Sequence, residues 1–290
     1  MLKTLLKIIF PGVSWKNPVL NLIIKAISPI DYIVRSLHGI SYLPPYSIRV
    51  RSNGVTKQFG GQNFYRYGNQ LANHLQTYAF LNNESKVLEI GCGCGRTAFA
   101  LSNILDKGNF IGMDIERVSL ESCKNQPAFI KKGFRFDFFD VHNDEYNPDG
   151  KERANTYKFP YDDNAFDVIF LVSVFTHMLT DEVKNYIVEI SRMLKPGGIC
   201  MVTSFLMDKG RETSSFSFIY NEQDHYFYKK SMPEVAIGYY FDFFRINFES
   251  CGLKPIHEVL WGSWRNSPEV ISSSGFSQDI IFLSKIKNFI

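Results

Sequence analysis

Apolar and polar residues alternate in blocks from Lys86 onward, and the blocks fit strands that alternate with helices. Short runs that are apolar throughout are typical of strands buried on both faces, whereas an apolar residue at every third or fourth position is typical of a helix. The predicted strands are residues 87–90, 109–113, 134–139, 166–172, 199–205, 255–261 and 279–285. The predicted helices between them are residues 97–105, 118–130, 181–194 and 235–251. This order predicts an α/β fold with a doubly wound, mainly parallel sheet and helices on both faces.

The ends of two elements can also be predicted. The helix over residues 181–194 has Thr180 as its expected N-cap, and residues 195–198, Lys-Pro-Gly-Gly, end it. The last two strands have no helix between them, so they are expected to pair antiparallel.

Residues 1–60 depart from this pattern and are expected to form an N-terminal extension with helical pieces. One domain over residues 61–290 follows, and it opens with a helix over residues 69–82. Lysine and proline interrupt both apolar runs within residues 1–30, so neither reaches the roughly 18 apolar residues of a membrane-spanning helix. Residues 2–9 form a short amphipathic pattern, which suits either a peripheral membrane contact through residues 1–30 or packing against the chain's own body.

The composition of the 290 residues is that of an ordinary globular protein, with 45% hydrophobic and 21% charged residues. The net charge is +3 and no block of Lys and Arg is present, so a nucleic-acid partner is not expected. The five cysteines are odd in number, and their spacing fits neither a disulfide framework nor a four-ligand zinc site. We therefore expect reduced thiols, no metal centre and a cytoplasmic protein.

The segment over residues 87–96, Val-Leu-Glu-Ile-Gly-Cys-Gly-Cys-Gly-Arg, runs from a predicted strand through three glycines toward a predicted helix. Glycines let the backbone turn sharply and let a ligand approach main-chain atoms, and the start of a helix offers free N–H groups. A dinucleotide site has the spacing G-x-G-x-x-G, whereas this segment has G-x-G-x-G. The loop therefore favours a nucleotide-type cofactor without a pyrophosphate cradle.

Three polar residues follow the next three strands. Asp114, 19 residues after Gly95, can accept both hydroxyls of a ribose or cap the helix after it. Asp140 either reaches an adenine amino group or is a plain loop residue. His177 lies where ligands bind in such sheets, and it is either a general base or a residue that packs against the loop or hydrogen-bonds the cofactor.

Four motifs together resemble those of the class I S-adenosylmethionine (SAM)-dependent methyltransferases, in the same order over about residues 64–286. They are Glu89-x-Gly91-x-Gly93-x-Gly95, Gly112-Met113-Asp114, Phe159-Pro160-Tyr161-x-x-x-x-Phe166-Asp167 and Arg192-x-Leu194-Lys195-Pro196-Gly197-Gly198. Three further motifs resemble a bacterial subgroup associated with cell-surface polysaccharide or glycan biosynthesis. They are Tyr146-Asn147-Pro148-x-Gly150, Ser173-Val174-Phe175-Thr176-His177-Met178, and Gly262-Ser263-Trp264 followed by Gln278-Asp279-Ile280.

The resemblance implies a seven-stranded Rossmann-like sheet with an antiparallel last strand, and SAM as the cofactor. It implies that Glu89 and the loop Gly91–Gly95, with Cys92 and Gly93, hold the methionine part of SAM. The other cofactor-binding residues that it implies are Asp114 at the ribose, Ile115 next to it in the chain, Asp140 and Val141 at the adenine, and Ser173 and Val174 beside the sulfonium.

The implied activity is methyl transfer to a small-molecule, saccharide or glycolipid acceptor, at oxygen. Residues 41–68, 206–233 and 262–277 are expected to shape the acceptor site, because the sheet does not fix them. The pocket candidates are Tyr65, Tyr67, His142 and Trp264. Three alternatives stay open at this point: a methyltransferase for another small molecule or a lipid, a nicotinamide-dependent oxidoreductase, and a non-catalytic SAM-binding or partner-binding protein.

Overall fold

The computed structural model describes residues 17–53, 58–207, 218, 220–222, 224–228, 230, 233–265 and 272–287. Seven strands of its sheet lie in the spatial order β3-β2-β1-β4-β5-β10-β9. They are β1 (Val87–Ile90), β2 (Phe110–Asp114), β3 (Arg135–Phe138), β4 (Phe166–Leu171), β5 (Leu194–Met207), β9 (Leu253–Pro255) and β10 (Asp279–Lys285). Strands β1 to β5 pair in parallel, whereas β10 is antiparallel to both β5 and β9. The predicted doubly wound fold with an antiparallel last strand is confirmed.

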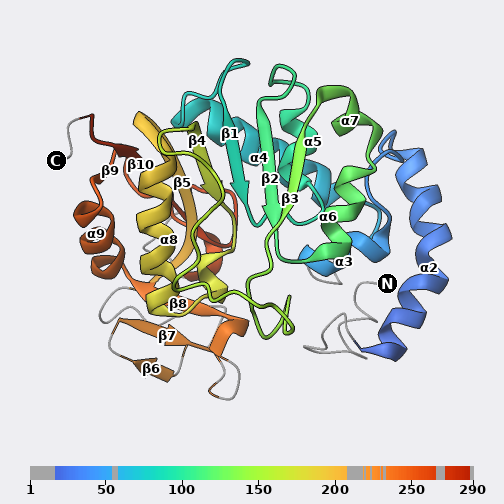
Figure 1. Ribbon diagram of the computed structural model, residues 1–290. Helices are drawn as coiled ribbons and strands as arrows, with labels where there is room; N and C mark the ends of the chain where they lie inside the picture. The colour runs from blue at the N-terminus through green and yellow to red at the C-terminus, as the bar shows by residue number, and fades with distance from the viewer. Residues whose placement is uncertain are drawn as a thin grey trace.

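Helices cover both faces of this sheet, as Figure 1 shows. The helices are α2 (Pro18–Leu37), α3 (Tyr46–Asn53), α4 (Gln62–Tyr78), α5 (Arg96–Leu101), α6 (Arg117–Lys124), α7 (Pro127–Lys132), α8 (Thr180–Met193) and α9 (Phe241–Ser250). Successive residues of a strand point to opposite faces, so Leu88 packs in a core with α8 and α9, whereas Val87 packs in a core with α4 and α5. The two cores hold the carboxyl ends of the parallel strands rigidly at one edge.

The prediction of a helix over residues 235–251 is wrong at its start. Residues Ile237–Tyr240 form strand β8, and α9 begins only at Phe241. Strand β5 runs on to Met207, past the predicted end, and this extension pairs in parallel with β8. Two short antiparallel strands, β6 (Tyr220–Glu222) and β7 (His225–Phe227), continue the sheet beyond β8, at the lower edge of Figure 1. The apolar run over residues 235–240 fits a strand as well as a helix. Here it forms a strand because the extended edge of β5 is available for pairing.

Three further boundaries differ from the prediction. The expected helix over residues 118–130 is two helices, α6 and α7, because Pro127 starts a new one. Thr180 is the first residue of α8 instead of its cap, and the Glu182 carboxylate accepts a hydrogen bond from the Leu179 N–H at 2.8 Å. Of the predicted strand over residues 255–261, only Pro255 belongs to β9, while Leu260 forms an isolated bridge to β10.

The N-terminal extension is more regular than predicted, since α2 has 20 residues. The Asn17 side chain accepts hydrogen bonds from two N–H groups of its first turn, and Pro18 is its first residue. Among the helices of the described residues, none has the length and apolar character needed to cross a bilayer. The predicted amphipathic segment over residues 2–9 lies outside the described residues.

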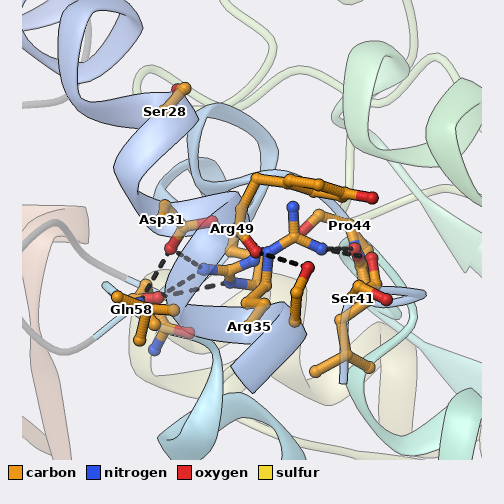
Figure 2. A network of polar contacts seen from close by, with 12 residues as sticks. Ser28, Asp31, Arg35, Ser41, Pro44, Arg49 and Gln58 are labelled. Atoms are coloured by element: carbon orange, nitrogen blue, oxygen red, sulfur yellow. Dashed lines mark hydrogen bonds and ion pairs between the residues drawn. The ribbon is translucent and has the colours of Figure 1, made fainter. Parts of the chain in front are cut away.

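A buried ionic network fastens α2 to the rest of the chain (Figure 2). Asp31 is fully buried on α2, and its carboxylate accepts from Arg35 Nε at 2.9 Å, Arg49 Nη2 at 2.6 Å and the Gly60 N–H at 2.8 Å. Arg49, on α3, also donates to the backbone carbonyl of Gln58 at 2.7 Å. Because a buried carboxylate needs such partners, these contacts fix α2, α3 and the segment before α4 as one unit.

Candidate active site

The loop between β1 and α5 owes its shape to three glycines with left-handed backbone angles. The φ values of Gly91, Gly93 and Gly95 are 77°, 53° and 80°, a region that side chains disfavour. A Cβ at Gly91 would lie 2.5 Å from a Val174 methyl carbon, and one at Gly95 would lie 2.9 Å from the Phe129 ring. Gly91 therefore lets the loop approach the segment after β4, whereas Gly95 lets α5 pack on α7.

Asp114, at the end of β2, fastens this loop from the side. Its carboxylate accepts from the Gly93 N–H at 2.6 Å and from the Glu116 N–H at 2.7 Å. Burial raises the pKa of this carboxyl to about 6, against the effect of the two backbone hydrogen bonds. The aspartate thus holds the glycine loop in place while it faces the cleft described below.

Glu89 is a buried carboxylate with an incomplete set of partners. Its side chain lies on β1 and is 3% exposed, and no described residue pairs with its Oε2 atom. Burial raises the pKa of Glu89 to about 8, although the nearby positive charge of Arg96 opposes the rise. A buried oxygen without a partner is costly, so this site suits a cationic or hydrogen-bonding ligand.

Two cavities meet at the carboxyl ends of β1, β2 and β4 and together form one cleft. We call them the first lobe, of about 130 Å³, and the second lobe, of about 440 Å³. Both are lined by Gly91, Gly93, Tyr146, Val172, Ser173 and His177. The first lobe adds Asp114, Ile115, Glu116, Phe139, Val141, His142, Asn143, Ala154, Val174, Met178, Glu182 and Tyr186. The second lobe adds Gln58, Tyr67, Leu71, Glu89, Cys92, Arg96, Thr203, Ser263, Gly275, Phe276, Ser277 and Gln278.

Most of the residues predicted to bind the cofactor lie in this cleft. Those that line it are Glu89, Gly91, Cys92, Gly93, Asp114, Ile115, Val141, Ser173 and Val174, together with His177. Gly95 and Asp140 line neither lobe. Gly95 packs behind the loop, and the Asp140 carboxylate accepts from Asn147 Nδ2 at 3.2 Å.

Ser173 holds a strained backbone conformation where the two lobes meet. Its φ is 59°, unusual for a residue with a side chain. The Ser173 N–H donates to Thr203 Oγ1 at 2.8 Å, and the Thr203 hydroxyl donates to Gln278 Oε1 at 2.6 Å. Strand β5 and the residue before β10 therefore hold Ser173 in this strained conformation. Backbone strain of this kind is typical of a functional site.

His177 follows β4 in a short 3₁₀ helix and lines both lobes. Its Nδ1 atom lies 2.8 Å from the Glu234 carbonyl oxygen, which can only accept, so Nδ1 carries the proton and donates. Its ring packs edge-on against Tyr146, and no described residue pairs with Nε2. Burial lowers the pKa of His177 below its usual 6.5. The imidazole is therefore neutral near pH 7, with a free lone pair on Nε2.

The further pocket candidates divide into two groups. Tyr67 and His142 line the cleft, whereas Tyr65 lies on another surface depression. Trp264 is buried, and its Nε1–H donates to Asp279 Oδ2 at 2.8 Å, so its role is to join the chain before β10 to the sheet. The prediction that Trp264 lines the pocket is wrong. Parts of the segments expected to shape the acceptor site, residues 208–217 and 266–271, lie outside the described residues.

Sequence reasoning gave no individual role to three polar residues of the second lobe, although Gln58 lies in a segment expected to shape the acceptor site and Gln278 lies in a quoted motif. Gln58 comes from the extension, Arg96 from the first turn of α5, and Gln278 from the residue before β10. The position of Arg96 directly after the glycine loop is a local signal that was available. The other two reach the cleft only through the tertiary fold.

Comparison with known proteins agrees with this geometry. Residues 88–202 match the family model of a methyltransferase domain, and the match contains the glycine loop, Asp114 and His177. The structure of the PH0226 protein from Pyrococcus horikoshii OT3 covers 78% of this chain and 92% of its own, with a TM-score of 0.54 and 15% identity. At that identity the likeness concerns the fold alone.

Curated relatives match over part of the chain. A tRNA N(3)-cytidine methyltransferase from Bos taurus is 31% identical over 123 residues, 41% of this chain and 29% of the relative. A sterol 24-C-methyltransferase from Schizosaccharomyces pombe is 24% identical over 170 residues, 56% of this chain and 40% of the relative. The chain thus spans less than half of the length of these relatives. The predicted class and cofactor, a SAM-dependent methyltransferase, are confirmed for the domain over residues 88–202.

Proposed function

We propose that this chain uses its methyltransferase domain to methylate a hydroxyl group of a small polar acceptor, a saccharide or glycolipid, with His177 as the general base. One observation supports this most strongly. His177 lies where the two lobes meet, and its free Nε2 belongs to a neutral imidazole. A hydroxyl must lose its proton when it is methylated, and a neutral imidazole at this point can accept that proton.

The residues of the cleft fit SAM as its cofactor. The unpaired Glu89 oxygen suits the ammonium group of the methionine part, and the Asp114 carboxylate suits the ribose hydroxyls. The apolar side chains of Ile115 and Val141, in the first lobe, suit the adenine. When bound, SAM supplies a methyl group that is already activated by a cationic sulfur. The protein therefore mainly needs to position the reactants and to exclude water. The backbone of Ser173, which is held in a fixed conformation where the two lobes meet, can contribute to this positioning.

The Glu234 carbonyl gives His177 its orientation. Because this carbonyl accepts the Nδ1 proton, the lone pair on Nε2 is directed away from Glu234 and is free to accept the acceptor's proton. His177 would accept the proton of the acceptor hydroxyl at Nε2, and that oxygen would receive the methyl group of bound SAM, which would leave as S-adenosylhomocysteine. In the alternative that the sequence left open, His177 only packs against the loop, and the pH profile described below separates the two roles.

The lining of the second lobe supports a hydroxylated acceptor. Tyr67 and Phe276 lie with their ring centroids 5.5 Å apart, and Ser263, Ser277 and Gln278 supply hydrogen-bonding groups. Flat rings beside amides and hydroxyls suit a sugar, which has an apolar face and polar edges. The motifs shared with the glycan-associated subgroup point to the same class of acceptor. Curated relatives act on tRNA and on sterols, so both classes belong in the test.

Cofactor binding is tested first, by calorimetric titration of the protein with SAM and S-adenosylhomocysteine. We expect the Asp114→Ala variant to lose at least tenfold in affinity, about 1.4 kcal/mol, whereas the exposed Asp149→Ala variant serves as the matched control. No binding of either ligand by folded protein contradicts the assignment. Binding without transfer to any acceptor class identifies a SAM-binding protein that is not an enzyme.

Methyl transfer is then measured with labelled SAM and a panel of saccharides, glycolipids, sterols and tRNA. For a hydroxyl acceptor we expect kcat/KM to level off at high pH and to fall as His177 is protonated, at a pKa below 6.5. The His177→Gln variant should lose this pH dependence and about 10²-fold or more in rate. An unchanged profile in that variant assigns His177 to packing, and tRNA as the acceptor overturns the proposed substrate class.

A further inference from the structure

Helix α2 has two apolar faces, and the residues that the structure describes cover only one of them. Leu20 and Ile24 on the inner face are 1% exposed, and they pack against α3. The outer face consists of Val19, Leu22, Ala26, Ile30, Ile33 and Leu37, all exposed. Its five large side chains expose between 54% and 80% of their surface. A contiguous apolar surface is unfavourable in water, and it commonly marks a site that binds a partner.

The outer residues form one continuous stripe. Their separations are three or four positions throughout, which places them on one side of a helix with 3.6 residues per turn. The stripe runs the whole length of α2, about 30 Å for 20 residues. In Figure 1 α2 lies along the right edge of the molecule, beside the sheet domain, and no other labelled helix or strand of the described residues lies on its outer side.

The net charge of residues 1–83 indicates which kind of partner this face would bind. Residues 1–83 contain nine Lys or Arg and one acidic residue, Asp31, and so have a net charge of +8. The whole chain has a net charge of +3, so the remaining residues have −5. Asp31 is buried together with Arg35 and Arg49, so seven Lys or Arg and no acidic residue of this part lie outside that network. The N-terminal part is therefore strongly basic, and Lys25, which is exposed on α2, lies beside the apolar stripe.

We propose that α2 docks this protein on the surface of an anionic lipid bilayer. The apolar stripe enters the interface between head groups and acyl chains, and the basic residues bind the negative lipid head groups. A second copy of the chain is a poorer partner, because two surfaces of the same positive charge repel each other. A nucleic acid would match the positive charge, but it binds proteins mainly through polar contacts and would not bury the row of aliphatic side chains.

Docking at α2 would fix the orientation of the catalytic cleft relative to the membrane. Asp31, on the inner side of the helix, binds Arg49, which in turn binds the Gln58 backbone, and Gln58 lines the second lobe (Figure 2). The helix therefore keeps a fixed position relative to the acceptor site. A fixed orientation at the membrane suits an acceptor that the membrane carries, for example a glycolipid, and this last step rests on the proposed function.

The test measures binding of the full chain to sedimented vesicles of phosphatidylcholine, with and without phosphatidylglycerol. We expect binding to the anionic vesicles, weaker binding to neutral ones, and weakening by salt. The double variant Leu22→Asn/Ile33→Asn should bind anionic vesicles at least tenfold more weakly. The control is Ile246→Asn on α9, a side chain of similar exposure in a separate part of the fold, and it should bind like the wild type. Both variants should keep the unfolding midpoint and the SAM affinity of the wild type, because the changed side chains are exposed.

Three results of the vesicle and light-scattering measurements overturn the proposal: folded wild-type protein that binds no anionic vesicles, a double variant that binds them as well as the wild type, or a dimer in light scattering that the double variant abolishes. Binding of tRNA that is lost in the double variant also overturns it. SAM titration of the same samples is independent of vesicles. A failure of membrane docking can therefore be distinguished from a failure of the proposed methyltransferase activity.

Discussion

The buried carboxyl of Glu89 makes a quantitative prediction for the Glu89→Gln variant. Its pKa in the folded protein is about 8, against 4.5 for an ordinary glutamate, so the folded state binds a proton more tightly than the unfolded state. Folding therefore loses stability as pH rises from 4.5 to 8. With these two values the cost of ionisable Glu89 to folding is about 1 kcal/mol at pH 5 and about 3 kcal/mol at pH 7. Glutamine at this position does not titrate and avoids this cost.

We expect the stability advantage of Glu89→Gln over the wild type to grow by about 2 kcal/mol between pH 5 and pH 7. Urea unfolding of both proteins at pH 5, 6 and 7 measures this difference, and all other titrating groups cancel in it. The Glu84→Gln variant, which changes an exposed carboxyl, is the control and should show no such growth. A constant difference between Glu89→Gln and the wild type would show that Glu89 is not the desolvated group described above. SAM titration should show the opposite trend, with weaker binding by the more stable variant.

Three further variants test how the site is held. Asp31→Asn removes the charge that two buried arginines share and should cost about 3 kcal/mol in urea unfolding, and a loss below about 1 kcal/mol contradicts the role of the network. Trp264→Phe leaves Asp279 without one hydrogen bond and should cost about 2 kcal/mol, checked in the same way; an unchanged midpoint means that the bond contributes nothing. Gly91→Ala forces a left-handed residue and a 2.5 Å contact with Val174, and should abolish SAM binding in calorimetry. Binding at wild-type affinity means that the loop can move.

Local patterns predicted the elements that carry the cofactor loop. The strand over residues 87–90 and the strand over residues 279–285 have the predicted bounds, because both are apolar runs between clear polar ends. The structure of residues 235–251 was harder to predict, since periodicity does not distinguish a short apolar strand from a helix. Strand β8 forms in this segment because β5 continues to Met207 and offers an edge to pair with, which only the assembled sheet shows.

The site shows the same division between local and tertiary information. Asp114 and the glycine loop follow strands directly, so their position at the sheet edge could be derived from the sequence. Trp264 was a pocket candidate from its segment alone, and its burial could not be derived because it depends on a hydrogen bond to Asp279, which lies on another element. Gln58 reaches the cleft only because Arg49 holds its backbone. Such contacts join residues that no local pattern relates.

The position of β10 has a consequence for how this protein is made. Of the seven strands in the central order, β10 is the last in sequence, yet it lies between β5 and β9. A ribosome that has reached Gln278 has therefore already synthesised every other strand of the sheet, whereas β10 has not yet been made. The hydrogen bond from Thr203 to Gln278 forms only then. A nascent chain consequently exposes an unpaired edge of β5 until synthesis has passed Lys285, which gives chaperones a defined segment to protect.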